Sequence, residues 1–225
     1  MTRIPAGTPA RRTVRSFVRR EGRLTPAQAR ALARLWPRYG LEPEGLRDLD
    51  RAFDSAGPVT LEIGFGNGEV LAALARRHPE RRFLGMEVYR PGIGRLLQAL
   101  EREGVGNVRL VQGDAAELLP LMPTGALDEI LILFPDPWPK KRHHKRRLIQ
   151  PAFVAALARV LRPGGRLHLA TDWEDYARHM CEILAAEAAF VADPQQSVLR
   201  RPTTRFERRG RLRGHGVWEL DYRRA

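Results

Sequence analysis

The chain has 225 residues, enough for one domain with a substantial hydrophobic core. Its net charge of +13 points to a polyanionic partner, with nucleic acid favoured over an anionic membrane surface. No apolar run reaches the ~20 residues needed to cross a bilayer, and the single cysteine, Cys181, excludes an intramolecular disulfide and a cysteine-rich zinc site, so we expect a cytoplasmic protein without a metal site.

The first predicted elements follow a basic segment. Residues 1–24 carry seven arginines against a single acid, and we interpret them as a mostly irregular arm. Thr25 and Pro26 are typical of a helix start, because threonine caps free N–H groups and proline fits the first turn. We therefore predict a helix that runs to Trp36, and a second helix around residues 45–53.

From residue 58 onward, strands and helices alternate along the chain. The predicted strands are 59–63, 83–88, 108–112, 127–134 and 166–171. The predicted helices are 69–77, 93–102, 115–121, 148–161 and 173–186. A basic, loop-like segment at 193–215 precedes a late strand at 217–222. This alternation predicts an α/β protein with a parallel sheet covered by helices on both faces.

A glycine-rich turn follows the first of these strands. The sequence Leu-Glu-Ile-Gly-Phe-Gly-Asn-Gly places Gly64, Gly66 and Gly68 where the backbone can turn tightly and approach a ligand. The spacing is not the Gly-x-Gly-x-x-Gly of dinucleotide binders. Glu62 lies just before the turn and suits a cationic ligand such as S-adenosylmethionine better than a pyrophosphate. The alternative is an ordinary glycine turn without a ligand.

Acids also end the next two predicted strands. Glu87 comes about 20 residues after the glycines, where an acid can accept both hydroxyls of a ribose. Asp114 ends the third strand and could meet an adenine edge. Each acid alone could be a solvated strand end. Together with Glu62 they lie at the carboxyl edge of the sheet, where open α/β sheets bind their ligands.

The fourth strand leads into the sequence Phe134-Pro-Asp-Pro-Trp138. Its prolines stiffen the loop, and Asp136 would face the reactive end of a cofactor, unless it is only a turn aspartate. Trp138 could stack on a base or pack under the loop. All three lysines of the chain lie in the basic run 140–147 that follows. We interpret this run as a phosphate-binding surface, with a solvated helix start as the alternative.

Two further segments carry candidate polar residues. Asp172 follows the predicted strand 166–171 and could be either a substrate contact or a helix N-cap. The segment Thr203–Glu207 lies in the basic C-terminal region and, out of context, would be read as a capped helix start.

With these motifs in place, the chain resembles the bacterial tRNA (guanine-N7-)-methyltransferases of the TrmB type. The Phe-Pro-Asp-Pro-Trp-x-Lys and Thr-Arg-Phe-Glu motifs, in this order, are specific to that family. The resemblance extends over nearly the whole chain and is carried by segments 15–20, 61–68, 85–89, 107–114, 134–147, 171–173, 204–207 and 214–216.

The resemblance implies a class I S-adenosylmethionine-dependent methyltransferase fold, which is Rossmann-like with a seven-stranded, mostly parallel sheet and helices on both faces. It implies methyl transfer from S-adenosylmethionine to N7 of guanine 46 in the variable loop of tRNA. It assigns to the cofactor Glu62, Glu87, Asp114 and Asp136, with Asp136 as the catalytic residue. It assigns to the substrate Lys140, Asp172, Thr204, Arg205, Phe206 and Glu207.

The chemistry suggests a specific role for Asp136. Guanine N7 carries a free lone pair and no proton, so its attack on a methyl group needs no general base. Alignment of the reactants and a fixed negative charge near the developing purine cation would help instead. We therefore expect Asp136 to orient the base and to stabilise positive charge.

Two other functions fit parts of the sequence. One is an RNA methyltransferase that acts on an adenine amino group. Enzymes of that class also have a loop that combines Asp, Pro and an aromatic residue, as Asp136-Pro-Trp138 does here. The other is a non-catalytic RNA-binding module on the same fold. In each case we expect a basic arm at 1–24 and one domain at 25–225, whose segment 193–215 binds the substrate. We expect a monomer or a homodimer with no obligate protein partner and no membrane association.

Overall fold

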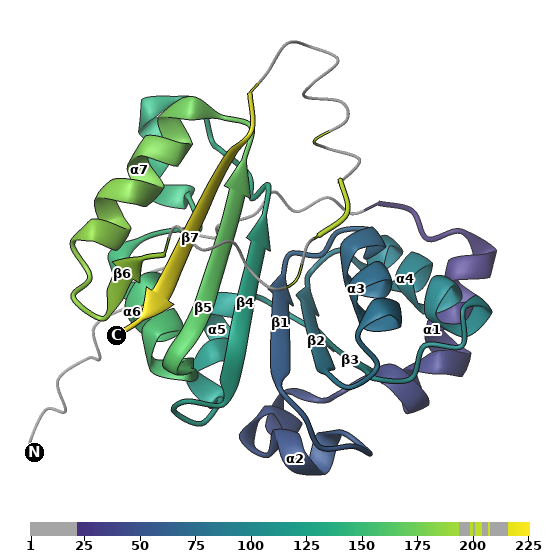
Figure 1. Ribbon diagram of the computed structural model, residues 1–225. Helices are drawn as coiled ribbons and strands as arrows, with labels where there is room; N and C mark the ends of the chain where they lie inside the picture. The colour runs from purple at the N-terminus through teal and green to yellow at the C-terminus, as the bar shows by residue number, and fades with distance from the viewer. Residues whose placement is uncertain (1–21, 194–198, 200, 204–206, 208–215) are drawn as a thin grey trace, which may run out of the picture.

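The computed structural model describes residues 22–193, 199, 201–203, 207 and 216–225. Seven strands form one sheet (Figure 1): β1 (Val59–Ile63), β2 (Arg82–Glu87), β3 (Val108–Gln112), β4 (Leu127–Leu133), β5 (Leu161–Thr171), β6 (Phe190–Ala192) and β7 (Trp218–Arg224). The α-helices are α1 (Pro26–Tyr39), α2 (Leu49–Ala52), α3 (Glu69–Arg77), α4 (Arg90–Arg102), α5 (Ala115–Leu118), α6 (Pro151–Val160) and α7 (Glu174–Ala185). Short 3₁₀ helices are η1 (Pro43–Arg47), η2 (Leu119–Leu121) and η3 (Lys141–Arg146).

The sheet has the strand order β3-β2-β1-β4-β5-β7-β6. Strands β1 to β5 are parallel, whereas β7 is antiparallel to both β5 and β6. The predicted seven-stranded, mostly parallel sheet is therefore confirmed. The chain moves outward from β1 to β3 and then returns to β4 beside β1. This reversal creates a switch point between β1 and β4, where ligands of open α/β sheets bind.

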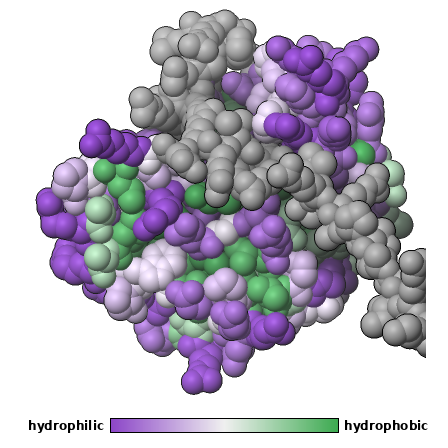
Figure 2. All heavy atoms as spheres, turned by 180° about the vertical axis from the view of Figure 1, so that it is seen from behind, coloured by the Kyte–Doolittle hydropathy of each residue, from purple (hydrophilic) through white to green (hydrophobic). Residues whose placement is uncertain are grey.

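Helices cover both faces of the sheet, as predicted. Residues Val59, Leu61 and Ile63 of β1 share one apolar cluster with α6 and α7. On the other face, Phe83 of β2 joins the cluster that includes α1, α3 and α4 (Figure 1). Seen from behind, the surface is mostly hydrophilic, and hydrophobic residues show as patches between polar ones (Figure 2). The packing fixes the positions of the strand ends that carry the site.

Helix α1 begins as its sequence predicts. The Thr25 side chain accepts a hydrogen bond from Gln28 N at 3.2 Å, and Thr25 N donates to the Gln28 side chain at 2.9 Å. Gln28 also donates to the carbonyl of Pro91 at 3.1 Å, which ties α1 to the start of α4. The helix ends at Tyr39, three residues beyond the predicted end, since Pro37 is accommodated inside it.

The structure differs from the predicted elements in several places. The predicted helix 45–53 is two short helices, η1 and α2, because Asp48 interrupts them and its side chain accepts from Arg51 N. The three-residue strand β6 was missed, since so short an edge strand has no clear alternation. Strand β5 begins at Leu161 rather than at residue 166, because Leu161 pairs with Leu127 ahead of a register shift.

The predicted arm and much of the basic C-terminal segment cannot be compared with the structure. Residues 1–21 and most of 194–215, including Thr204, Arg205 and Phe206, lie outside the described residues. Within the described part, no helix is long and apolar enough to cross a membrane.

The contact between α4 and the glycine turn gives a stability prediction. A methyl group at Gly92 would lie 2.0 Å from the carbonyl oxygen of Gly66, so Gly92→Ala must displace backbone. We expect Gly92→Ala to lower the free energy of unfolding by about 1–3 kcal/mol, measured by urea unfolding. Gly106→Ala is the control, because its new methyl group would meet nothing closer than 3.9 Å. Equal stability of the two variants would contradict this packing account.

Candidate active site

The turn after β1 leaves room for a ligand. Gly64, Gly66 and Gly68 have φ angles of 73°, 56° and 74°, in the left-handed region that favours glycine. Side chains at positions 64 and 66 would point into space where no described residue lies within 4 Å. Gly68 then starts α3 as its N-cap. The backbone of this turn is therefore shaped for close approach, as a ligand-binding turn requires.

Glu62 is the most unusual acid in the protein. It lies in β1 between β2 and β4, and only 3% of its surface is exposed. Its Oε2 atom has no hydrogen-bond partner among the described residues. Burial and the nearby charge of Glu87 raise the pKa of Glu62 to about 8, although Arg201 opposes the shift. A buried carboxyl group with an unpaired oxygen is costly unless a ligand pairs with it.

Glu87 braces the glycine turn. Its carboxylate accepts hydrogen bonds from the backbone N–H groups of Gly66 at 2.7 Å, Val88 at 2.7 Å and Tyr89 at 2.9 Å. Burial nevertheless raises the pKa of Glu87, and Asp136 adds to the increase. The predicted contact with a ribose would have to use the remaining acceptor capacity of this carboxylate.

Asp114 lies beside this pair but also has a local role. Gly113 N donates to the Glu87 carbonyl at 3.1 Å, which brings the end of β3 next to the end of β2. Asp114 is the N-cap of α5, where its Oδ1 accepts from Ala116 N at 3.0 Å. The three acids at successive strand ends therefore meet at one edge of the sheet. Helix capping explains in part why an acid stands at position 114.

The loop after β4 brings a fourth acid to the same edge. Burial raises the pKa values of both Glu87 and Tyr176, and the charge of Asp136 adds to both increases, so Asp136 lies near these two residues. The residues on either side of its Pro-Asp-Pro segment, Phe134 and Trp138, have positive φ angles of 53° and 46°. Such strained backbone in non-glycine residues persists where surrounding contacts hold it, commonly at functional sites.

Two side chains of the basic run contact Trp138. The Arg146 guanidinium lies 5.0 Å from the Trp138 ring centroid, and the His143 ring meets it edge-on at 5.7 Å. Lys140, Lys141 and Lys145 are exposed around the 3₁₀ helix η3. The lysine cluster is thus available to solvent and to a polyanion.

Asp172 lies at the end of β5, next to the loop that carries Asp136. Phe134 N donates to the Ala170 carbonyl at 2.7 Å, which joins the ends of β4 and β5. The N-cap of α7 is Trp173, so the alternative that Asp172 is a helix N-cap was wrong.

Glu207 is held by an arginine that the sequence analysis missed. Glu207 is buried and accepts from Arg201 Nη1 at 2.7 Å, and Arg201 also pairs with Glu219 of β7. The Arg201 guanidinium lies 5.6 Å from the Phe134 ring, and its charge acts on Glu62. Arg201 therefore joins the C-terminal segment to the strand ends. Nothing in the sequence distinguishes Arg201 from the other arginines, of which the chain has 36 in all, so this linking role could not be predicted.

The arrangement fits a cationic ligand. Glu62, Glu87 and Asp136 bring carboxyl groups together beside a glycine turn, and such groups suit the ammonium and sulfonium groups of S-adenosylmethionine. The described residues contain no group of three or more His, Cys, Asp or Glu side chains that could hold a metal.

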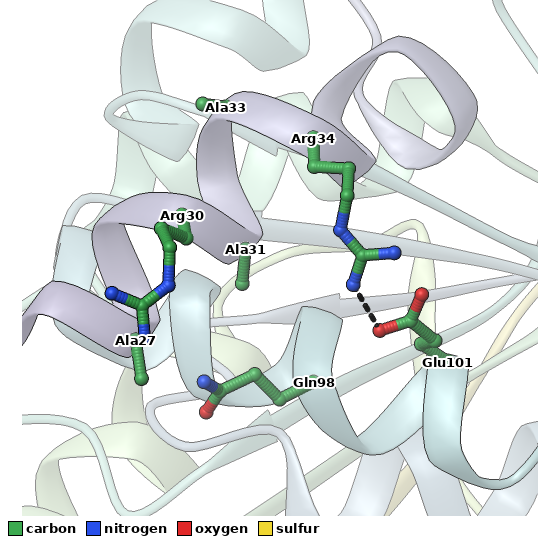
Figure 3. Close-up of a pocket in the computed structure, with 7 residues that line it drawn as sticks. All are labelled: Ala27, Arg30, Ala31, Ala33, Arg34, Gln98 and Glu101. Carbon is green, nitrogen blue, oxygen red and sulfur yellow. Dashed lines mark hydrogen bonds and ion pairs between the residues drawn. The ribbon is translucent and has the colours of Figure 1, made fainter.

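A separate pocket of about 430 Å³ lies between α1 and α4, lined by Ala27, Arg30, Ala31, Ala33, Arg34, Gln98 and Glu101 (Figure 3). Its Arg34 and Glu101 form an ion pair at 2.5 Å. None of the predicted site residues lines this pocket, so we do not assign it to the active site.

Comparison with known proteins agrees with the fold and extends it. Residues 56–220 match the family described as putative methyltransferase. The tRNA (guanine-N(7)-)-methyltransferase of Alkalilimnicola ehrlichii is 55% identical, over 100% of this chain and 98% of that protein. The enzyme of the same name from Nitrosococcus oceani is 55% identical, over 95% of this chain and 92% of its own.

Among solved structures, a 16S rRNA (adenine(1408)-N(1))-methyltransferase from Catenulisporales acidiphilia superposes with a TM-score of 0.56. The superposition covers 82% of this chain and 92% of that enzyme, at 18% sequence identity. Because the identity is so low, the likeness shows a shared fold alone. Because identity above half extends over more than nine tenths of both relatives, this chain belongs to the tRNA (guanine-N7-)-methyltransferase family.

Proposed function

We propose that this protein transfers the methyl group of S-adenosylmethionine to N7 of a guanine in tRNA, at position 46 of the variable loop. The observation that carries the proposal is the 55% identity, over the whole chain, to relatives named for this reaction. The acidic strand ends at the switch point support it, because they suit a cationic methyl donor. A tRNA substrate agrees with the net charge of +13, because a basic protein attracts a polyanion. It also implies that the enzyme acts in the cytoplasm.

The donor-binding side of the site uses backbone shape and carboxylates. We propose that Glu62 binds the ammonium of the donor, that Glu87 and Asp114 contact its ribose and adenine, and that Gly64 and Gly66 allow the close approach. S-adenosylmethionine supplies an electrophilic methyl group when bound. Glu62 is buried and unpaired at Oε2, which is the state expected of a carboxyl group that awaits a cationic partner.

Asp136 orients the base and stabilises charge in this proposal. Guanine N7 has a lone pair and no proton, so no residue has to remove one. A carboxylate held by two prolines offers a fixed negative charge where the purine becomes positive. Lys140, which follows Asp136 in the same loop, and Asp172, which follows β5, would contact the tRNA, as would the segment from Thr204 to Glu207.

The reaction is tested by methyl transfer to unmodified tRNA followed by nucleoside analysis. The expected product is 7-methylguanosine at position 46. A methylated adenine would instead support the amino-group methyltransferase. Binding of RNA without any transfer, and without binding of S-adenosylmethionine, would support the non-catalytic module.

The raised pKa of Glu62 predicts a conflict between stability and ligand binding. A carboxyl group whose pKa is about 8 in the folded state and 4.5 when exposed destabilises the fold as pH rises from about 4.5 to 8. Glu62→Gln removes that cost, so it should become more stable than the wild type by roughly 2–5 kcal/mol at high pH. It should also bind S-adenosylmethionine more weakly. A stability difference that does not change between pH 5 and pH 9 would contradict this assignment of the pKa.

Asp136→Asn tests the role of negative charge. The variant should lower the single-turnover rate at saturating tRNA and donor by about 10²–10³-fold, because it removes the charge and keeps the shape. The affinity for tRNA should stay within about threefold of the wild type. Asp50→Asn, at a distant exposed aspartate, should leave the rate unchanged. A clear slowing of the wild-type rate in D₂O would favour proton removal by Asp136 instead.

The lysine cluster predicts a salt effect. Replacing Lys140, Lys141 and Lys145 by Gln should weaken tRNA binding and lower the slope of log affinity against log salt by about 1–3, since each lost duplex phosphate contact removes about 0.9. The control replaces Arg76, Arg77 and Arg102, which lie at the last turns of α3 and α4, with the same change in charge. Equal salt slopes for the two triple variants would rule out a specific role for the lysines.

A further inference from the structure

Arg147 differs from the rest of the basic run in being buried. Only 2% of its surface is exposed, whereas Lys145 and Arg146 beside it are exposed. A side chain in this position cannot bind an RNA phosphate as its neighbours can. Its role must therefore be sought in the contacts that it makes inside the protein.

Those contacts join two elements of the active site. Arg147 Nε donates to the Pro137 carbonyl at 3.0 Å, and its Nη2 donates to Asp175 Oδ2 at 2.5 Å. The guanidinium carbon lies 4.9 Å from the ring centroid of Tyr176, whose hydroxyl accepts from Ile149 N at 3.2 Å. One planar group thus binds the loop after β4 and the first turn of α7 together.

The two elements carry the residues on which the proposed reaction depends. Pro137 directly follows Asp136, and Asp175 lies three residues after Asp172. Burial raises the pKa of Tyr176 to about 12, and the charge of Asp136 adds to the increase, so Asp136 lies near the ring on which Arg147 packs. A shift of Arg147 would therefore change the position of Asp136 relative to Asp172.

We propose that Arg147 is a positioning residue that fixes the loop of Asp136 against the strand end of Asp172, an inference that rests on the proposed function. The geometry needs an arginine, because the two bonds leave a planar fork in different directions while its face packs on a ring. A lysine offers a single ammonium group on a flexible stem. Misplacement by about 1 Å near reacting groups can lower a rate by about 10²-fold.

Arg109 provides a matched control. It is also buried, donates to the carbonyls of Ala52, Gly106 and Val108, pairs with Asp54 at 2.9 Å and lies over the Phe53 ring. It lies near the start of β3, at the edge of the sheet opposite the site. Arg109→Lys therefore disturbs the same kinds of contact without touching the active-site loop.

The experiment compares Arg147→Lys, Asp175→Asn and Arg109→Lys with the wild type below their unfolding temperatures. The measurements are the single-turnover rate at saturating donor and tRNA, the affinity for each ligand, and hydrogen exchange of residues 134–147. Arg147→Lys should lower the rate about 10- to 100-fold and speed exchange in the loop, while donor affinity stays within about threefold. Arg109→Lys should do neither, even where its unfolding temperature falls as far.

Asp175→Asn keeps the proposal testable if Arg147→Lys does not fold, because the Asp175 side chain is half-exposed. It should lower the rate in the same direction but less, and it should add little to Arg147→Lys in a double variant. A wild-type rate retained by both single variants would overturn the role of Arg147. Failure of the wild type itself to methylate tRNA would overturn the proposed function instead, so the two failures are distinguishable.

Discussion

The site depends on one buried carboxyl group at the end of the central strand. Glu62 is enclosed by β2 and β4, has an unpaired oxygen, and lies near Glu87, on which the charge of Asp136 acts in turn. Burial and like charges both disfavour its ionised form. A cationic ligand reverses this balance, because it pairs with the carboxylate and reduces the repulsion among the acids. The buried carboxyl group therefore lowers the stability of the fold, but it makes the site favourable for a positively charged methyl donor.

Arginine and lysine have different roles in the described part of this protein. Arg147 is buried and Arg201 is half-buried, and each links active-site segments through several bonds at once. The lysines are exposed on a short 3₁₀ helix beside the loop of Asp136. This division follows from their chemistry, since a rigid fork suits fixed bonds between elements and a flexible point charge suits a mobile phosphate backbone. Among the described residues, arginine therefore serves internal structure, and not surface charge alone.

The sequence was sufficient to predict the fold and the edge of the sheet at which Glu62, Glu87 and Asp114 lie. Alternation of apolar runs with amphipathic helices predicts the parallel sheet, and strand-end acids follow from that sheet because parallel carboxyl ends meet at one edge. The partners of those acids could not be predicted. Arg147 belongs to a basic run that reads as an RNA contact, and only the packed structure reveals that its side chain turns inward. Likewise, Glu87 gives no sign in the sequence that three backbone N–H groups occupy its carboxylate.

The central claim is that Glu62 is protonated in the free protein and ionised when it binds the ammonium of S-adenosylmethionine. Titration calorimetry at pH 7, in buffers with different ionisation enthalpies, measures the protons released on binding. With a Glu62 pKa of about 8, the wild type should release close to one proton more than Glu62→Gln at pH 7. This difference should fall to almost none above about pH 9, and it is independent of the protons that the amino group of the ligand exchanges. Equal proton release by the wild type and Glu62→Gln at pH 7 would contradict the account.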